Sequence, residues 1–194
     1  MTERNKEQVK STFRMDDDPA DTIQTMRVTF GLGKALLKVR NTATLDEDEA
    51  GLVEIAAETT AWIGANIARS NGISRAGMID VLLTGGTDLP DRGEPMECCI
   101  QSHEDAVEVV TSLFIRGMTT GGLSEVLKES GQIASAEVLS HAGTAITLAA
   151  KDVATYWDVE SREVIDAIRA MDEGLHFLAE LVEIALYGNF TFTM

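Results

Sequence analysis

Proline is scarce in this chain, and its placement limits what the chain can fold into. It occurs at only three of 194 positions, Pro19, Pro90 and Pro95. The stretches 20–89 and 96–194 therefore contain none of the residue that most strongly interrupts a helix. Apolar residues in both stretches recur every three or four positions, which is the period of an amphipathic helix. Apart from the C-terminal tail, no segment shows the strict alternation that is typical of a strand. The sequence therefore predicts an all-α fold.

Capping residues and glycines divide the two stretches into six or seven helices. Asp18 before Pro19 predicts a helix start, Thr44 and Glu47 predict a capping box, and the pairs Asn71–Gly72 and Gly121–Gly122 predict helix ends. The expected helices cover about 19–40, 46–70, 74–83, 96–118 (or from Ser102), 123–130, 133–156 and 159–187. Because the connections between them are mostly short, we expect antiparallel helical hairpins packed as a helix bundle.

A single domain is expected to account for most of the chain. Residues 1–18 are polar and are interpreted as a flexible tail, residues 19–187 as the all-helical domain, and residues 188–194 as a C-terminal tail. A core of this size needs no disulfide or metal to be stable. Glycines and prolines gather at residues 84–95, where the domain could divide into two units, 19–83 and 96–187.

The chain carries a formal net charge of −16, and this charge is distributed unevenly. Residues 1–40 hold eight basic and six acidic residues, a net of +2, whereas residues 41–194 hold eight basic and 26 acidic residues, a net of −18. An acidic body repels nucleic acid and anionic membrane surfaces at long range. The charge therefore favours solubility, or a basic partner protein, over binding to nucleic acid.

Targeting and redox features predict a cytoplasmic protein. No apolar run approaches the roughly 18 residues of a transmembrane helix, and the first twenty residues lack the apolar centre of a secretory signal. The two cysteines, Cys98 and Cys99, are adjacent and cannot build a disulfide framework. We expect no membrane contact.

Two of the expected helices are apolar on more than one face, which predicts contacts beyond a single hairpin. The helix at 159–187 has one continuous apolar stripe from Val164 to Ala185 and further apolar residues beside it. The additional residues, from the helix at 19–40 and then from the helix at 159–187, are Val28, Leu32, Leu36, Phe177, Leu181 and Ile184. They could pack within the chain, or they could form the interface of a homo-oligomer, most simply a dimer, and we take them as the candidate interface residues.

A tight pair of helices is predicted at residues 67–82. Ala68 permits close approach of the two helices and Gly72 permits the turn between them. Apolar side chains fill the space between the helices, at Ile73, Met78 and Val81. The same steric pattern suits any tight helical hairpin.

This segment resembles the helix-turn-helix DNA-binding proteins over about sixteen residues. The resemblance implies that the second helix enters the major groove and that three residues lie near bases or phosphates, namely Arg69, Ser74 and Arg75. Gly77 inside the second helix departs from that pattern. Residues 60–92 hold three arginines and three aspartates, a net charge of zero, whereas a DNA-reading surface is basic. Nucleic acid is therefore possible as a partner but disfavoured by charge.

Motifs that would indicate a catalytic or metal site are incomplete. Glu173 and His176 match one E-x-x-H element of a di-iron bundle, which needs two such elements. Two acidic pairs, Glu160–Glu163 and Glu180–Glu183, could bind magnesium in a helical nucleotide hydrolase. However, a helical-wheel projection places Glu180 toward solvent, and acidic residues at 160 and 163 suit the first turn of a helix. We assign no catalytic or metal-binding residue and expect no cofactor.

These features favour a non-enzymatic regulatory or adaptor protein that acts on a protein partner through its helical surfaces. Three alternatives stay open. The first is a helix-turn-helix transcriptional regulator that uses residues 67–82. The second is an acidic, DNA-mimicking inhibitor that occupies the nucleic-acid-binding surface of a basic protein, and the third is a small metal-dependent helical hydrolase.

Overall fold

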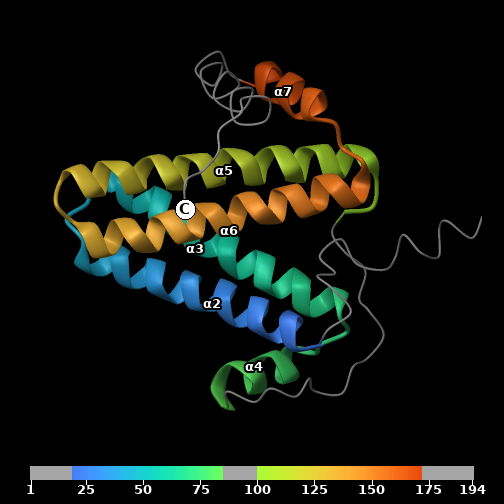
Figure 1. Cartoon of the computed structure of the whole chain (residues 1–194), viewed down its shortest axis with the longest axis horizontal. Coiled ribbons are helices and arrows are strands. Elements are labelled where there is room, and N and C mark those ends of the chain that lie inside the picture. The colour runs from blue at the N-terminus through green and yellow to red at the C-terminus, as the bar shows by residue number, and fades with distance from the viewer. Residues whose placement is uncertain (1–18, 85–99, 172–194) are drawn as a thin grey trace, which may run out of the picture.

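The computed structural model describes residues 19–84 and 100–171, and within them the chain forms six α-helices and no strand (Figure 1). The helices are α2 (Pro19–Thr42), α3 (Glu47–Ser70), α4 (Arg75–Thr84), α5 (His103–Glu129), α6 (Ile133–Trp157) and α7 (Ser161–Ala170). The predicted all-α fold is confirmed for these residues. The predicted tails at 1–18 and 188–194, and nearly all of the connection at 84–95, lie outside the described residues.

Helices α2, α3, α5 and α6 form a four-helix bundle made of two antiparallel hairpins (Figure 1). Helix α2 packs on α3, α5 packs on α6, and the hairpins meet through α2 on α6 and α3 on α5. The two hairpin turns are joined by the side-chain amide of Gln132. This amide accepts a hydrogen bond from the backbone N–H of Thr44 at 2.8 Å and donates one to the Thr44 carbonyl at 3.1 Å. Each bundle helix is therefore antiparallel to both of its neighbours.

Apolar side chains from all four helices fill the bundle core. Burial of one such side chain contributes about 1.5–3 kcal/mol of hydrophobic free energy, so the core dominates the stability of the fold. The largest fully buried side chains of the bundle include Met26, Leu36, Val53, Ile67, Val110, Leu127, Leu139 and Ile146.

Helices α5 and α6 come closest where glycines of the two helices face each other. A methyl group placed on Gly143 would lie 2.9 Å from the carbonyl oxygen of Gly117 and 3.1 Å from the amide nitrogen of Gly121. A methyl group placed on Gly117 would lie 3.1 Å from the carbonyl oxygen of Gly143 and would collide with the hydroxyl of Thr147. Backbone atoms cannot move aside as a side chain can, so this crossing requires glycine.

The α2–α3 hairpin is also closely packed, with glycine facing threonine. A methyl group on Gly33 would lie 3.1 Å from the hydroxyl oxygen of Thr60, and one on Gly64 would lie 2.6 Å from that of Thr29. Each hydroxyl donates a hydrogen bond to a carbonyl of its own helix, at 2.9 Å for Thr60 and 3.0 Å for Thr29. The buried hydroxyls are therefore satisfied without separating the helices.

Helix α5 continues through Gly121 and Gly122, where the sequence predicted a helix end. Each glycine costs about 1 kcal/mol of helix propensity relative to alanine. The close contact of Gly121 with α6, and the burial of Leu123 and Leu127 beyond the glycines, outweigh this cost. The two helices predicted at 96–118 and 123–130 are thus one helix. It begins after Ser102, which was the later of the two predicted starts.

The cap of α3 lies two residues later than predicted. Asp46 accepts a hydrogen bond from the Glu49 N–H at 2.8 Å, and the Glu49 carboxylate accepts one from the Asp46 N–H at 2.9 Å. The predicted box of Thr44 and Glu47 does not form, since the backbone of Thr44 is bonded to Gln132 of the other hairpin. A contact between the two hairpin turns therefore selects the cap.

Helix α7 ends at Ala170, inside the helix predicted at 159–187. The N–H of Met171 bonds to the carbonyl of Ile168 at 3.1 Å, which tightens the last turn, and Met171 then takes an extended backbone. The predicted apolar stripe does not continue past this point as one helix. The rest of that prediction lies outside the described residues.

Two short helices, α4 and α7, pack on the outside of the bundle (Figure 1). Helix α4 lies against α2, where Nη2 of Arg27 donates to the carbonyl of Val81 at 3.3 Å. Helix α7 lies against α5 and buries three apolar side chains, Val164, Ile165 and Ile168.

We predict opposite effects for two glycine substitutions. Gly143→Ala should lower the free energy of unfolding by about 1–3 kcal/mol, because the added methyl meets the backbone of α5. Gly122→Ala is the matched control, since a methyl there meets nothing within 4 Å and should raise the free energy of unfolding by about 0.5–1 kcal/mol through helix propensity. Chemical denaturation measures both, and a Gly143→Ala protein as stable as the wild type would contradict the close crossing.

Candidate functional site

The helical pair predicted at residues 67–82 consists of the end of α3, a turn and the start of α4. Gly72 in the turn has a φ of 68°, a conformation that favours glycine. Ile73 and Val81 are buried, as predicted. The three predicted DNA-contact residues are all exposed: Arg69, Ser74 and Arg75.

The exposed face of α4 is apolar rather than basic. Ile79, Leu82 and Leu83 are exposed and are spaced as neighbours on one side of the helix, with Leu83 81% exposed. The hydroxyl of Ser74 accepts a hydrogen bond from the Gly77 N–H at 3.1 Å and so acts as a helix cap. A helix that reads the major groove presents polar and basic groups. DNA binding by the helical pair at residues 67–82 stays a prediction, and the apolar surface of α4 gives it no support.

The predicted interface residues of α2 differ in exposure. Val28 is 45% exposed and Leu32 is partly exposed, so both reach the surface. Leu36 is fully buried, which corrects its assignment to an outer face. Its burial follows from the position of α2, which is covered by both α3 and α6. The other predicted interface residues lie outside the described residues: Phe177, Leu181 and Ile184.

An apolar groove opens where α2, α3 and α6 meet, and we call it the α2–α3–α6 groove. Val28 of α2 and Leu148 of α6 are its large exposed apolar side chains, with Leu148 54% exposed. Ile63 and Ile67 of α3 line it and are buried. Its volume is about 190 Å³. The remaining lining residues are Gln24, Thr25, Thr29, Ala145, Ala149 and Asp152.

The buried threonine of the groove, Thr29, requires no polar ligand. The hydroxyl of Thr29 donates to the carbonyls of Thr25 and Met26 in its own helix, each at 3.0 Å. The hydroxyl is therefore satisfied within α2. The groove is a surface to which apolar groups can bind without leaving that hydroxyl unpaired.

Asp152 is the one charged residue among those that line the groove in the described part of the chain. Its carboxyl has no hydrogen bond or ion pair with any described residue. Asp152 is exposed at the surface, yet the neighbouring protein atoms remove part of the hydration of its carboxyl and raise its pKa above the ordinary value of 3.8. No described cation offsets this shift. The groove thus carries a negative charge that nothing in the described chain neutralises.

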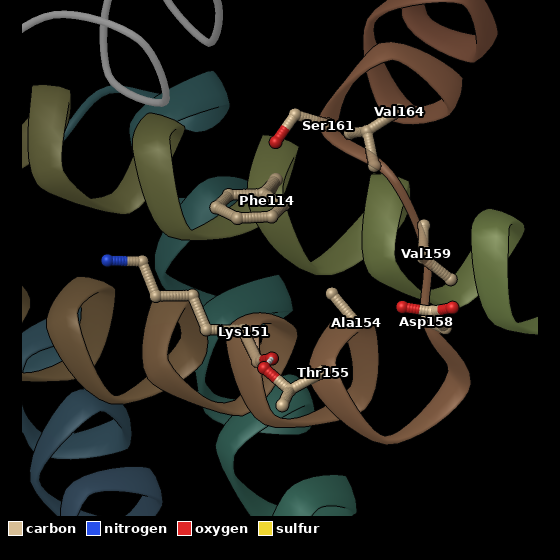
Figure 2. Close-up of a pocket in the computed structure, with 8 residues that line it drawn as sticks. All are labelled: Phe114, Lys151, Ala154, Thr155, Asp158, Val159, Ser161 and Val164. Carbon is tan, nitrogen blue, oxygen red and sulfur yellow. Dashed lines mark hydrogen bonds between the residues drawn. The ribbon is translucent and has the colours of Figure 1, made fainter.

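A second, more open pocket of about 360 Å³ lies where α5, α6 and α7 meet (Figure 2). Phe114, Ala154 and other apolar side chains line it, and Figure 2 shows the amine of Lys151 and the carboxylate of Asp158 on opposite sides. Asp158 ends α6 in the left-handed conformation, with a φ of 56°, which places it at the sharp turn toward α7. Neither charged side chain has a hydrogen bond to another described residue that would fix its position, so the described residues give the pocket no preorganised charged group.

Within residues 19–84 and 100–171, no side chains gather as a metal-binding group. The hydroxyl of Ser161, in the second pocket, has no hydrogen bond to a base there. No cluster of three potential metal ligands occurs among these residues, and Glu163 of the predicted acidic pair instead contacts a histidine. No helix in the same part of the chain is both long and apolar enough to span a membrane.

His103 joins α5, α6 and α7 at one end of the bundle. Its Nε2 lies 2.9 Å from Oε1 of Glu163 in α7, and its Nδ1 lies 3.1 Å from the carbonyl oxygen of Trp157, the last residue of α6. A carboxylate and a carbonyl only accept hydrogen bonds, so both ring nitrogens must donate. The doubly protonated, positively charged imidazole satisfies this arrangement.

Both partners of this ion pair have shifted pKa values. The hydrogen bond to Glu163, then that to the Trp157 carbonyl, raises the pKa of His103 above its ordinary 6.5. The hydrogen bond from His103, then the capping bond from the Glu160 N–H, lowers the pKa of Glu163 below its ordinary 4.5. The pair holds α7 on the bundle through a contact that depends on pH.

The sequence analysis identified Val28 but neither the groove nor the His103–Glu163 pair. The groove needs residues from three helices that are far apart in the sequence, and the ion pair joins residues sixty positions apart. A weak signal was available for Asp152, an acidic residue that lies one turn after Leu148 in α6 and is preceded by a mostly apolar stretch and Lys151.

Comparison with profiles of protein families, with curated proteins and with solved structures finds no match to this chain. We therefore infer its function from the geometry and charge of its own surfaces.

We predict that α7 is docked most stably between pH 4.5 and 6.5. The contribution of His103 is complete below 6.5 and is lost as the pH rises through its raised pKa. The contribution of Glu163 is complete above 4.5 and is lost as the pH falls through its lowered pKa. Because both side chains are partly exposed, the loss should be about 0.2–1 kcal/mol.

Amide hydrogen exchange of α7, corrected for its intrinsic pH dependence, measures this stability. Glu163→Gln should remove the pH dependence between 5.5 and 8 while keeping the helix cap, since glutamine can also close a capping box. Asp166→Asn is the matched control, since the described partners of Asp166 are arginines of α7 itself. A Glu163→Gln profile identical to the wild type would refute the role of the pair.

Proposed function

We propose that this chain is a non-enzymatic regulatory or adaptor protein that binds a helical segment of another protein in the α2–α3–α6 groove. The observation that carries the proposal is the position of Val28 and Leu148, two large apolar side chains that stay exposed beside an apolar groove. Apolar grooves between helices receive the apolar face of an incoming amphipathic helix.

The size of the groove supports a protein side chain as its occupant. Sites for small ligands usually have volumes of about 300–1,000 Å³, whereas the groove has about 190 Å³. A space of this size suits an apolar anchor residue that projects from a larger binding surface. Antiparallel neighbours such as α2 and α6 also offer a long surface on which a third helix can lie.

The exposed face of α4 supports self-association as a second candidate. Ile79, Leu82 and Leu83 form an apolar stripe on a helix that is itself only lightly attached to the bundle through α2. An isologous contact of two such stripes would make a dimer. Light scattering during gel filtration should then give the mass of a dimer, and Leu83→Glu should give that of a monomer; a monomeric wild type would exclude this second candidate.

We predict that Leu148→Asp abolishes helix binding by the groove. The probes are fluorescent helical peptides stabilised by a side-chain staple, each with one exposed leucine, and their binding to the full chain is followed by anisotropy. Burial of a charged side chain in place of leucine should weaken binding by about tenfold or more, because an unpaired carboxylate would lose its hydration.

Ile133→Asp is the matched control for this experiment. Ile133 lies on the same helix with a similar exposure of 51%, but about 22 Å from Leu148 along the helix axis. The Ile133→Asp protein should bind the peptides with the same affinity as the wild type. Saturable binding that Leu148→Asp leaves intact, or no saturable binding by any leucine peptide, would count against the proposed function.

A further inference from the structure

We infer that the partner helix is basic, and that it places an apolar side chain beside Leu148 and a lysine or arginine against Asp152. This inference rests on the proposed function and names the chemistry of its partner. The juxtaposition that carries it is one acidic side chain, with no cation beside it in the described part of the chain, in a groove whose other lining residues are uncharged.

The spacing along α6 defines the pattern that the partner must show. Asp152 follows Leu148 by four residues, so the two side chains lie about one turn apart on the same side of α6. A helix lying along α6 presents its own residues at the same interval. The complementary pattern is therefore an apolar residue and a basic residue four positions apart.

The state of Asp152 explains why a cation is favoured there. Its side chain is exposed at the edge of the groove, where neighbouring protein atoms remove part of its hydration and raise its pKa, and no described residue pairs with it. A lysine or arginine that reaches the groove supplies the missing counter-charge in a partly desolvated place, where an ion pair is stronger than on an open surface. An acidic partner residue at this position would be repelled by the carboxylate of Asp152.

The charge of the whole chain favours the same partner. Residues 41–194, which include α3 and α6, carry a net charge of −18. A field of this sign attracts a basic helix before contact and raises its association rate. A second copy of the chain would bring a further −16 to the contact, so charge disfavours the chain itself as the occupant of this groove.

The test uses three stapled helical peptides that share one leucine and differ only at the position four residues away. That position carries lysine, norleucine or glutamate, and binding to the full chain is measured by fluorescence anisotropy. We expect the lysine peptide to bind about two- to fivefold more tightly than the norleucine peptide, and the glutamate peptide to bind more weakly than both.

Two neutralising variants on α6 separate the local charge from the overall charge. Asp152→Asn should remove the difference between the lysine and norleucine peptides. Glu137→Gln changes the net charge by the same amount at an exposed site outside the groove and should preserve the difference. Thermal melting of both variants checks that they remain folded.

Three other outcomes of these binding measurements would contradict the basic partner, the contact with Asp152 or the proposed function. Equal, Leu148-dependent binding of all three peptides would overturn the basic partner and leave the proposed function standing. A lysine preference that survives in Asp152→Asn would show attraction to the acidic chain as a whole and would overturn the contact with Asp152. If Leu148→Asp binds the peptides as well as the wild type, the proposed function fails, and this inference fails with it.

Discussion

The close contact of α5 with α6 is the interaction on which the rest of the structure depends. Glycines on both helices let their backbones approach until a single methyl group would collide with the facing chain. This fixes α6 against α5 on one side, and the other side of α6 then meets α2 and α3. The bond between Gln132 and Thr44 aligns the two hairpin turns. The α2–α3–α6 groove exists because these contacts hold α6 in place while Leu148 stays uncovered.

The bundle carries two different electrostatic arrangements. At one end, His103 of α5 and Glu163 of α7 form an ion pair on the surface. In the groove, the partial desolvation of Asp152 is not offset by any described cation. An unpaired charge of this kind destabilises the free protein slightly and favours a partner that supplies the opposite charge.

Much of the fold could be predicted from periodicity, caps and breakers, because these act over a few residues. The positions of α2, α3, α4 and α6 follow from them closely. The errors occur where a distant contact overrides a local preference. Gly121 remains helical because it faces α6, and Leu36 is buried because a second helix covers α2. The groove and the His103–Glu163 pair were not predictable for the same reason, since each joins residues from three different helices.

The sequence by itself determined the helical character of the chain, its acidic charge and the side of each helix that would be mostly apolar. These properties depend on residue type and on spacing along the chain. The tertiary structure decided which apolar side chains are buried and which stay exposed, because that depends on which helix packs against which face. It also decided which charges are paired: Glu163 lies beside His103, whereas Asp152 has no described counter-ion, although both are acidic residues on helices.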